Sequence, residues 1–276
     1  MVIQDMVKQY GRKHVKPNCL MKNDLQRPYD TVNWEFWKEM VQYLDFPQSF
    51  IELVMQSVTT PKFSLMINGS MKGFFMSSRG LRQGDPMSLL LFVICMKYLS
   101  RILMKMIELE QFKFHHRCKE IRLTHMCFEH DLILCCKGDY DSVVLMLRAF
   151  KLFSETSSLK VNVNKSAMYT CGMPDIDVTR IAAISGLSQQ ALPFKFLGVP
   201  ICAKKISAAQ CEALIDKMTG RIRVWSSRNM SYTARTLLIN SVLSSLHSYW
   251  DQAFVLPRLL YLPTICSRSW LLYLSL

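Results

Sequence analysis

The sequence predicts an α+β domain followed by a helical region. Half of the 276 residues are hydrophobic and a fifth are charged, which is typical of a globular protein rather than a disordered one. Strand and helix patterns interleave up to about residue 200, and only helical patterns follow. Lys and Arg outnumber Asp and Glu by 34 to 21, giving a formal net charge of +13. Such an excess favours a polyanionic partner, most often nucleic acid.

The first elements are two amphipathic helices and a hairpin. Residues 33–46 and 47–58 carry apolar side chains at helical spacing. Residues 62–76 form two strand-like runs around Asn68-Gly69, a strong hairpin turn signal. We therefore expect two helices and then an antiparallel hairpin.

A long apolar helix comes next. Asp85 can cap it and Pro86 fits its first turn, so the helix is expected over roughly residues 87–108. Its sequence is apolar around most of its circumference, which predicts a buried helix.

The remaining elements alternate before the chain becomes helical. Strands are expected at 120–128 and 132–136, on either side of the triplet Glu129-His130-Asp131. We expect an amphipathic helix at 141–157, a short strand pair within 159–171 and a strand at 193–201. From about residue 206 the pattern is helical and basic, with helices expected over 208–225 and 231–250.

No secretory signal and no uninterrupted apolar stretch of 18 residues is present, so we expect an intracellular protein, in cytoplasm or nucleus, that does not span a membrane. The ten cysteines contain no C-x-x-C pair and are expected to be reduced and mostly buried. A group of six side chains could in principle ligate zinc, but its spacing matches no common zinc pattern. It comprises His115, His116, Cys118, His125, Cys127 and His130.

One stretch is far more specific than the rest. "GLRQGDPMSLLLF", residues 80–92, closely resembles a loop–helix motif of the reverse transcriptases of LINE-type, non-LTR retrotransposons, of the kind abundant in plants. Further motifs of that family follow the same order over roughly residues 8–256. They are "LMKNDLQRPYDTVNWEFW" (20–37), "THMCFEHDLILCCKGD" (124–139), "SSLKVNVNKS" (157–166), "LPFKFLGVPI" (192–201) and "WSSRNMSYTARTLLINSVLSSLHSYW" (225–250).

The resemblance implies a fold and an activity. The fold would be a polymerase palm, an antiparallel sheet backed by helices, followed by a partial helical thumb. The activity would be RNA-directed DNA polymerization, a nucleotidyl transfer with an RNA template, a DNA primer and deoxynucleotide triphosphates. No protein partner is implied. The expected division is a remnant of the preceding segment at 1–17, the palm with fingers largely missing at 18–203, a partial thumb at 204–256 and an unrelated tail at 257–276.

The family's chemistry needs carboxylates that converge on two magnesium ions, because Mg²⁺ prefers oxygen ligands. By resemblance, Asp24 supplies the first carboxylate, and the turn at residues 128–131 stands where the family has Phe-Ala-Asp-Asp. Asp131 then matches the second aspartate of the turn, and His130 occupies the position of the first, a catalytic metal ligand. The metal ligands left in this chain would be Asp24 and Asp131.

Other roles carry over from the same motifs. Tyr29 would lie under the sugar of the nucleotide, and Arg82, Gln83 and Gly84 would approach nucleotide and template, with Gly84 permitting close backbone contact. Lys165 would act near the leaving pyrophosphate. Basic residues of the expected thumb suit a phosphate backbone. They are Lys217, Arg221, Arg223, Arg228 and Arg235.

Several departures from the family predict that this chain is catalytically inactive. Imidazole is a poor magnesium ligand and brings no negative charge, so His130 removes a ligand. Glu129 is expected to point away, because neighbouring residues of an extended strand face opposite sides. Arg27-Pro28 replaces Lys-Ala, Ser88-Leu89 replaces Ser-Pro, and Ser158 replaces a permissive glycine.

Three alternatives stay open at this point. The chain could be a non-catalytic nucleic-acid-binding remnant that uses its basic residues. It could be an unstable product with no role. It could also be a regulator that binds zinc through the His/Cys group.

Overall fold

The computed structural model describes residues 2–10, 12, 15–207, 209–226 and 230–254. These residues divide into two compact units. The sheet unit is Arg12–Gln190, and the helical unit combines Met1–Gly11 with Ala191–Leu276. The predicted α+β order is confirmed, because strands and helices alternate up to Ile201 and only helical elements follow in the described part of the chain. The family-based boundaries at 17, 203 and 256 stay predictions, and the expected tail at 257–276 lies outside the described residues.

A five-stranded sheet forms the centre of the sheet unit, in the order β4-β5-β1-β6-β7. All neighbouring strands are antiparallel except β6 and β7. The strands are β1 (Asn18–Asp24), β4 (His125–Phe128), β5 (Asp131–Lys137), β6 (Ala167–Cys171) and β7 (Ser188–Gln189).

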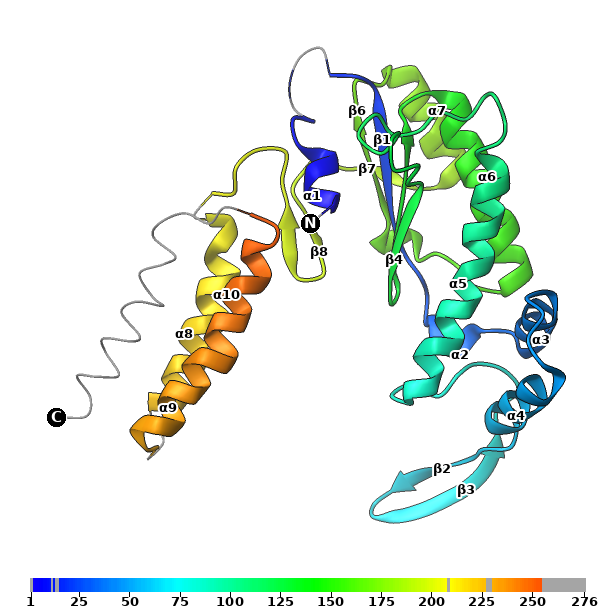
Figure 1. The fold of residues 1–276 in the computed structure, drawn as a ribbon, viewed down its shortest axis with the longest axis vertical. Coiled ribbons are helices and arrows are strands. Elements are labelled where there is room, and N and C mark those ends of the chain that lie inside the picture. Colours follow the sequence, from blue (N-terminus) through cyan, green and yellow to red (C-terminus); the bar gives the residue numbers. More distant parts are fainter. Residues whose placement is uncertain (1, 11, 13–14, 208, 227–229, 255–276) are drawn as a thin grey trace. The chain divides into compact units, whose positions relative to one another are not determined.

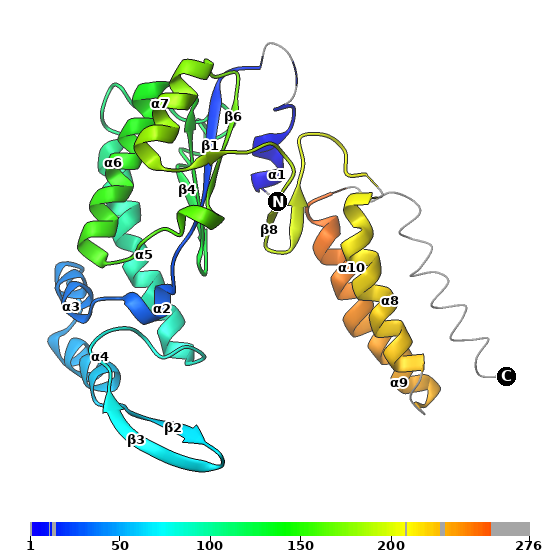
Figure 2. The same ribbon diagram turned by 180° about the vertical axis from the view of Figure 1, so that it is seen from behind.

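Three helices cover one face of this sheet (Figures 1 and 2). They are α5 (Pro86–Met106), α6 (Tyr140–Ser157) and α7 (Asp175–Ser185). Cys19 and Met21 of β1 and Leu134 of β5 belong to one buried apolar cluster with residues of these helices. Since side chains alternate along a strand, the intervening residues, including Asp24 and Asp131, lie on the opposite face. The sheet backed by helices that the sequence predicts is thus observed.

Between β1 and α5 the chain forms a helical segment and a hairpin. The short helix α2 (Pro28–Thr31) leads to α3 (Trp34–Tyr43), whose N-cap Asn33 accepts hydrogen bonds from two backbone amides. Helix α4 (Gln48–Thr59) precedes the hairpin of β2 (Lys62–Ile67) and β3 (Ser70–Met76). Asn68 and Gly69 both have positive φ, of 50° and 77°, which is the backbone that the predicted turn requires.

The helical unit has its own small core. The first helix, α1 (Val2–Val7), is bonded to the residue that follows β9 (Val199–Ile201), because the side chain of Gln4 exchanges two hydrogen bonds with the backbone of Cys202. A buried cluster that includes Leu214, Leu243 and Trp250 joins the later helices. The elements are β8 (Phe194–Phe196), β9 (Val199–Ile201), a 3₁₀ turn (Ala209–Cys211), α8 (Glu212–Ser226), α9 (Tyr232–Leu238), a π-helical segment (Ile239–Leu243) and α10 (Ser244–Asp251).

Four local predictions were wrong or incomplete. The strand expected over 120–128 covers only β4, because the amide of Leu123 bonds back to the carbonyl of Cys118 and bends the preceding residues into turns. The strand pair expected within 159–171 is an isolated bridge at Val161, a 3₁₀ turn (Val163–Lys165) and β6. The run 193–201 folds into two short strands, and α7 was not predicted.

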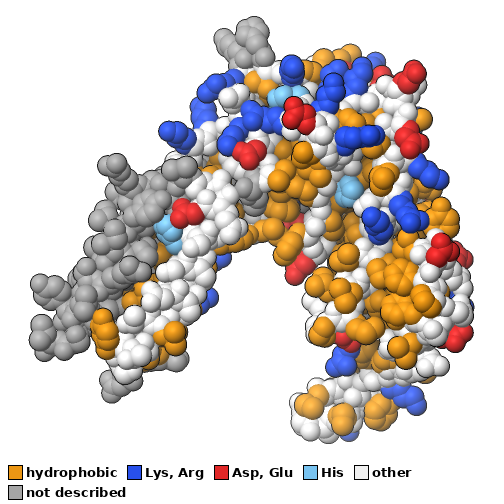
Figure 3. All heavy atoms as spheres, in the orientation of Figure 1, with side chains coloured by type: hydrophobic (Ala, Val, Ile, Leu, Met, Phe, Trp, Pro, Cys, Tyr) orange, Lys and Arg blue, Asp and Glu red, His pale blue; other side chains and the backbone are white. Residues whose placement is uncertain are grey.

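Helix α5 is buried on one face only, so the prediction of all-round burial was wrong. Leu91, Leu99 and Leu103 are buried, whereas Leu90 is 65% and Val93 56% exposed. By length and composition alone α5 could cross a membrane, a criterion that core helices of globular domains also meet. Hydrophobic side chains also reach the surface on hairpin β2–β3 (Figure 3).

Candidate active site

The turn between β4 and β5 holds the triplet that stands out in the sequence. Glu129 has a φ of 49°, so the chain reverses there, and His130 follows before β5 begins at Asp131. The amide of Leu25 donates a 2.8 Å hydrogen bond to the carbonyl of His130. This bond fixes the turn beside the end of β1, where Asp24 lies.

Asp24 and Asp131 are direct cross-strand partners in the antiparallel pair β1–β5. Opposite residues of such a pair share a face of the sheet, so the two predicted metal ligands are brought together. The backbone of Asp24 is held on both sides: its amide donates to Ser166 Oγ at 2.9 Å, and its carbonyl accepts from the amide of Asn162 at 2.8 Å. The position of Asp24 therefore depends on main-chain bonds to the segment that carries Lys165.

The carboxylate of Asp131 already has a cationic partner. Lys22 Nζ lies 3.3 Å from Asp131 Oδ1, and the two side chains are only 19% and 14% exposed. Lys22 stands two residues before Asp24 and therefore on the same face of β1. Because both side chains are mostly buried, water screens their attraction less than it screens an ion pair on the surface.

A cavity of about 710 Å³, here called the turn cavity, lies at this end of the sheet. It brings together six of the eight predicted site residues: Asp24, Tyr29, Gln83, Gly84, His130 and Lys165. Asp131 does not line it, and Arg82 instead lines a neighbouring cavity. The other lining residues are Leu25, Arg27, Pro28, Asp30, Asp85, Pro86, Leu89 and Glu129.

Glu129 is placed differently from the sequence-based expectation. It lines the turn cavity together with Asp24, and the backbone at Glu129 is left-handed rather than extended, so strand alternation does not govern its direction. Its carboxylate is 54% exposed and lies 4.0 Å from His130 Nδ1. The expectation that Glu129 points away from the site was wrong.

Tyr29 lies between the cavity and the core. Its ring packs on Phe92 of α5, with 5.2 Å between centroids. Burial raises the pKa of Tyr29, and the nearby charges of Glu129 and Cys127 raise it further. Tyr29 is thus a neutral aromatic side chain at the cavity wall.

The loop before α5 is held against α2 by backbone bonds. Gly80 donates to the carbonyl of Val32 at 2.8 Å, and Leu81 donates to the carbonyl of Tyr29 at 2.6 Å. Gly80 has a φ of 90°, and a Cβ there would lie 2.7 Å from the carbonyl oxygen of Asp30. Gly84 has a φ of 88° with nothing within 4 Å of a Cβ, so its backbone conformation is what requires glycine.

The structure shows the backbone setting of two further residues that depart from the family motifs. Ser158, where the family has glycine, has a φ of 65° at the C-cap of α6, a conformation that favours glycine. Pro28 occupies the first turn of α2, where a missing N–H costs little. Ser88 is buried and Leu89 lines the turn cavity.

The side chains present do not fit a two-magnesium centre. In the described part of the chain no three His, Cys, Asp or Glu side chains lie close enough to share a metal ion. One expected ligand is a histidine, and Asp131 is paired with Lys22. The turn cavity does hold carboxylates, those of Asp24 and Glu129 among them, so it is polar without being a metal cage.

The possible zinc ligands likewise form no group of three that could hold a metal ion within the described residues, although the His115 and His116 rings stack with centroids 5.4 Å apart. His116 Nδ1 bonds to the side chain of Asn18 at 2.8 Å, and His125 Nε2 bonds to Ser100 Oγ at 2.9 Å. A hydrogen bond with Cys135 lowers the pKa of the Cys118 thiol, and a hydrogen bond with His115 lowers it further. Eight of the nine described cysteines are buried, as predicted, and none of these nine is joined to another in a disulfide.

The basic residues expected in the thumb belong to the helical unit. Lys217, Arg221 and Arg223 are on α8 and Arg235 is on α9. Arg228 lies outside the described residues. Three of these side chains therefore belong to one helix, and Lys217 and Arg221, which are four residues apart, share one face of it.

Comparison with known proteins identifies similarity to reverse transcriptases and to retrotransposon proteins. A family model described as "Reverse transcriptase (RNA-dependent DNA polymerase)" matches residues 2–201. The chain is 27% identical over 101 residues, 37% of its length, to a Retrovirus-related Pol polyprotein from type-2 retrotransposable element R2DM of Drosophila melanogaster, of which it covers 10%. It is 21% identical over 247 residues, 88% of its length, to the Transposon TX1 uncharacterized 149 kDa protein of Xenopus laevis, of which it covers 18%.

Among solved structures, an apo telomerase from Candida tropicalis, truncated from its C-terminal domain, aligns with a TM-score of 0.48 and 12% identity. The alignment covers 75% of this chain and 38% of that one. The chain thus spans less than a fifth of the first two relatives and under half of this structure.

Proposed function

The chain belongs to the reverse transcriptase family, and we propose that it binds an RNA template and a DNA primer but does not extend the primer. The observation that carries the second half of this proposal is His130, at the turn position where the family has a metal-binding aspartate. The similarity to R2 and TX1 proteins supports a non-LTR retrotransposon origin. Its plant type stays a prediction.

Charge and cavity shape support nucleic-acid binding. The net charge of +13 provides the electrostatic attraction that dominates binding to a phosphate backbone. We propose that a deoxynucleotide triphosphate occupies the turn cavity, with Tyr29 under the sugar, Gln83 and Gly84 beside the nucleotide and template, and Lys165 near the leaving pyrophosphate. These roles come from the family motifs, and the common cavity supports them.

The side chains at the expected metal site support inactivity. Reverse transcriptases use divalent metal ions, which in this chemistry stabilise the attacking and leaving oxygens. We propose that this chain binds Mg²⁺ too weakly for synthesis. Replacing one hard carboxylate ligand by imidazole removes charge, and the amine of Lys22 competes for the second carboxylate.

A primer-extension assay tests inactivity. The purified full chain would be incubated with an annealed RNA template, a labelled DNA primer, deoxynucleotide triphosphates and Mg²⁺. We expect no extension above that of the matched Asp24→Ala variant. Magnesium-dependent extension that Asp24→Ala abolishes would show that the chain is an active polymerase and that the proposal is wrong.

Fluorescence anisotropy tests binding independently. The labelled primer–template should bind without added divalent metal, with an affinity that falls steeply as salt rises, because each phosphate contact releases counterions. A chain that unfolds cooperatively yet does not bind at low salt would refute the binding half. Absence of cooperative unfolding would favour an unstable product with no role.

The proposed cellular location of the protein rests on the proposed binding of an RNA template and a DNA primer. A protein that holds an RNA template and a DNA primer would act in the cytoplasm or nucleus, and we propose that location. Fractionation of expressing cells tests it: recovery in the secreted fraction would contradict it.

A further inference from the structure

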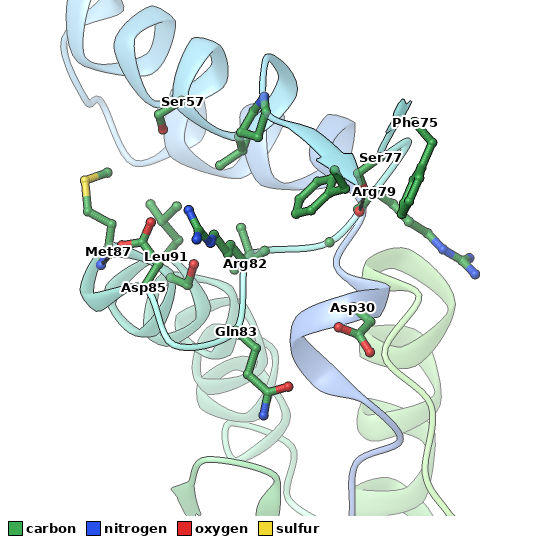
Figure 4. Close-up of a pocket in the computed structure, with 16 residues that line it drawn as sticks. Asp30, Ser57, Phe75, Ser77, Arg79, Arg82, Gln83, Asp85, Met87 and Leu91 are labelled. Carbon is green, nitrogen blue, oxygen red and sulfur yellow. Dashed lines mark hydrogen bonds between the residues drawn. The ribbon is translucent and has the colours of Figure 1, made fainter. Parts of the chain in front are cut away.

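A second cavity, of about 620 Å³, lies beside the turn cavity in the sheet unit and is here called the hairpin cavity (Figure 4). Helix α4, hairpin β2–β3, the loop before α5 and the start of α5 contribute its walls. Its volume is within the range of small-molecule sites. None of the family-derived roles except that of Arg82 and Gln83 involves it.

An aromatic pair forms part of the wall. Phe63 and Phe75 are partners in the β2–β3 register, and their rings stack with centroids 5.9 Å apart and planes at 28°. Both line the cavity, and Phe75 remains 51% exposed. An exposed ring already stacked on one side offers a flat apolar surface to a second planar group.

Cations and an amide accompany the rings. Arg79, Arg82 and Gln83 also line the cavity, and the side chain of Arg82 extends between α4 and α5 in Figure 4. Within the described residues, no ion pair involves either arginine. An aromatic surface beside arginines that form no ion pair is characteristic of single-strand binding sites, and Asp30 and Asp85 line the same cavity.

The hairpin cavity and the turn cavity share lining residues. Asp30, Gln83 and Asp85 line both of them. The two cavities therefore adjoin at α2 and at the loop before α5. A purely apolar ligand fits poorly, because charged side chains line the same walls.

We propose that the hairpin cavity binds an unpaired base of single-stranded nucleic acid, stacked on Phe75, with Arg82 at its phosphate. This inference rests on the proposed nucleic-acid binding and adds a specific subsite to it. Binding there needs no metal ion and no catalysis.

Anisotropy with a labelled single-stranded 12-mer RNA, in metal-free buffer and with the full chain, tests the subsite. Phe75→Ala should weaken binding by about tenfold or more, the typical effect of removing one stacking ring. Phe75→Trp should retain binding. Phe74→Ala is the matched control: Phe74 is 76% exposed, does not line the cavity and should have no effect.

Arg82→Gln provides a second readout. It should lower the dependence of log affinity on log salt by about 0.7, the value for one lost phosphate contact on a single strand. Lys72→Gln, on the same hairpin but outside the cavity lining, should reduce the affinity less than Arg82→Gln does. Unfolding curves of each variant ensure that lost binding does not reflect lost folding.

The outcomes separate the two proposals. Salt-sensitive binding that Phe75→Ala and Phe74→Ala affect equally, or not at all, would overturn the subsite and leave nucleic-acid binding standing. Binding of the primer–template without binding of the 12-mer would overturn the subsite alone. Failure of the folded wild-type chain to bind either ligand would overturn both proposals.

Discussion

Lys22 Nζ lies 3.3 Å from Asp131 Oδ1, so the aspartate that survives in the β4–β5 turn region is neutralised within the protein. A metal ion at Asp131 would have to displace an ammonium group whose charge already compensates the carboxylate. This pairing and the histidine at position 130 act in the same direction. Both lower the negative charge available to a cation beside Asp24.

Restoring the family turn should restore cation binding. The double variant Glu129→Ala/His130→Asp recreates Phe-Ala-Asp-Asp and adds a carboxylate at the lost ligand position. We expect it to bind Mn²⁺, a paramagnetic substitute for Mg²⁺, about tenfold more tightly than the wild type, because the carboxylate moves from position 129 to the ligand position while the number of carboxylates at the turn stays the same. Electron paramagnetic resonance measures free Mn²⁺ during titration.

The control adds Asp24→Ala to the double variant and should remove the gain. An unchanged Mn²⁺ affinity in the double variant would mean that Asp24 and position 130 do not form a common site.

Ser158→Gly should stabilise the protein. Ser158 holds a left-handed backbone at the end of α6, with a φ of 65°, which costs a side-chain-bearing residue about 1 kcal/mol. Glycine avoids that cost, and its greater freedom in the unfolded chain offsets part of the gain. Urea unfolding should show an increase of about 0.5 kcal/mol. Ser154→Gly, inside the same helix, should instead destabilise by about 0.5 kcal/mol.

Gly80→Ala and Gly84→Ala should differ although both glycines have similar φ values. A Cβ at Gly80 would meet the backbone of Asp30 at 2.7 Å, whereas Gly84 has open space. We expect a loss of about 1 kcal/mol at Gly84 from backbone strain alone, and about 3 kcal/mol at Gly80. Equal losses in the free energy of unfolding would show that the contact with α2 is not rigid.

Asp139→Asn should reduce the acid sensitivity of folding. Burial of Asp139 favours its neutral form, but hydrogen bonds from Ser142 and the charge of Lys137 outweigh this and hold its pKa below the ordinary 3.8. Its stabilising contribution is therefore present above pH 3.8 and is lost as the pH falls through the lower, folded value. Urea unfolding between pH 5 and pH 2.5 measures this.

Asparagine keeps the N-cap oxygen that Ser142 uses, so the cap itself should survive. The variant's unfolding free energy should decline less than that of the wild type over this range. A parallel decline would exclude Asp139 as a contributor.

Local signals explain the elements that the sequence predicted well. The hairpin β2–β3 follows from Asn68-Gly69, whose positive φ values need no distant contact, and α6 follows from its own periodicity and cap. Local signals did not predict the shortened β4 or the helix α7. The backbone bond between Leu123 and Cys118 competes with strand formation before β4. Helix α7 shows little amphipathic pattern.

Within the candidate site, the motif order predicted which residues line one cavity but not how they are partnered. The Lys22–Asp131 pair depends on the register of β1 against β5, which no local pattern specifies. The direction of Glu129 depends on a left-handed turn residue that strand alternation does not describe. The stacking of Phe63 on Phe75 similarly depends on hairpin register.

The main-chain anchoring of Asp24 has a consequence for how such proteins diverge. Its amide and carbonyl are bonded to Ser166 and Asn162, so the strand end keeps its place whatever side chain stands there. His130 is more than half exposed and its carbonyl, not its ring, is bonded to Leu25. Substitutions at either position cost folding little. Once synthesis is no longer under selection, the catalytic carboxylates can therefore be lost by neutral drift while the buried core, which stability still protects, remains.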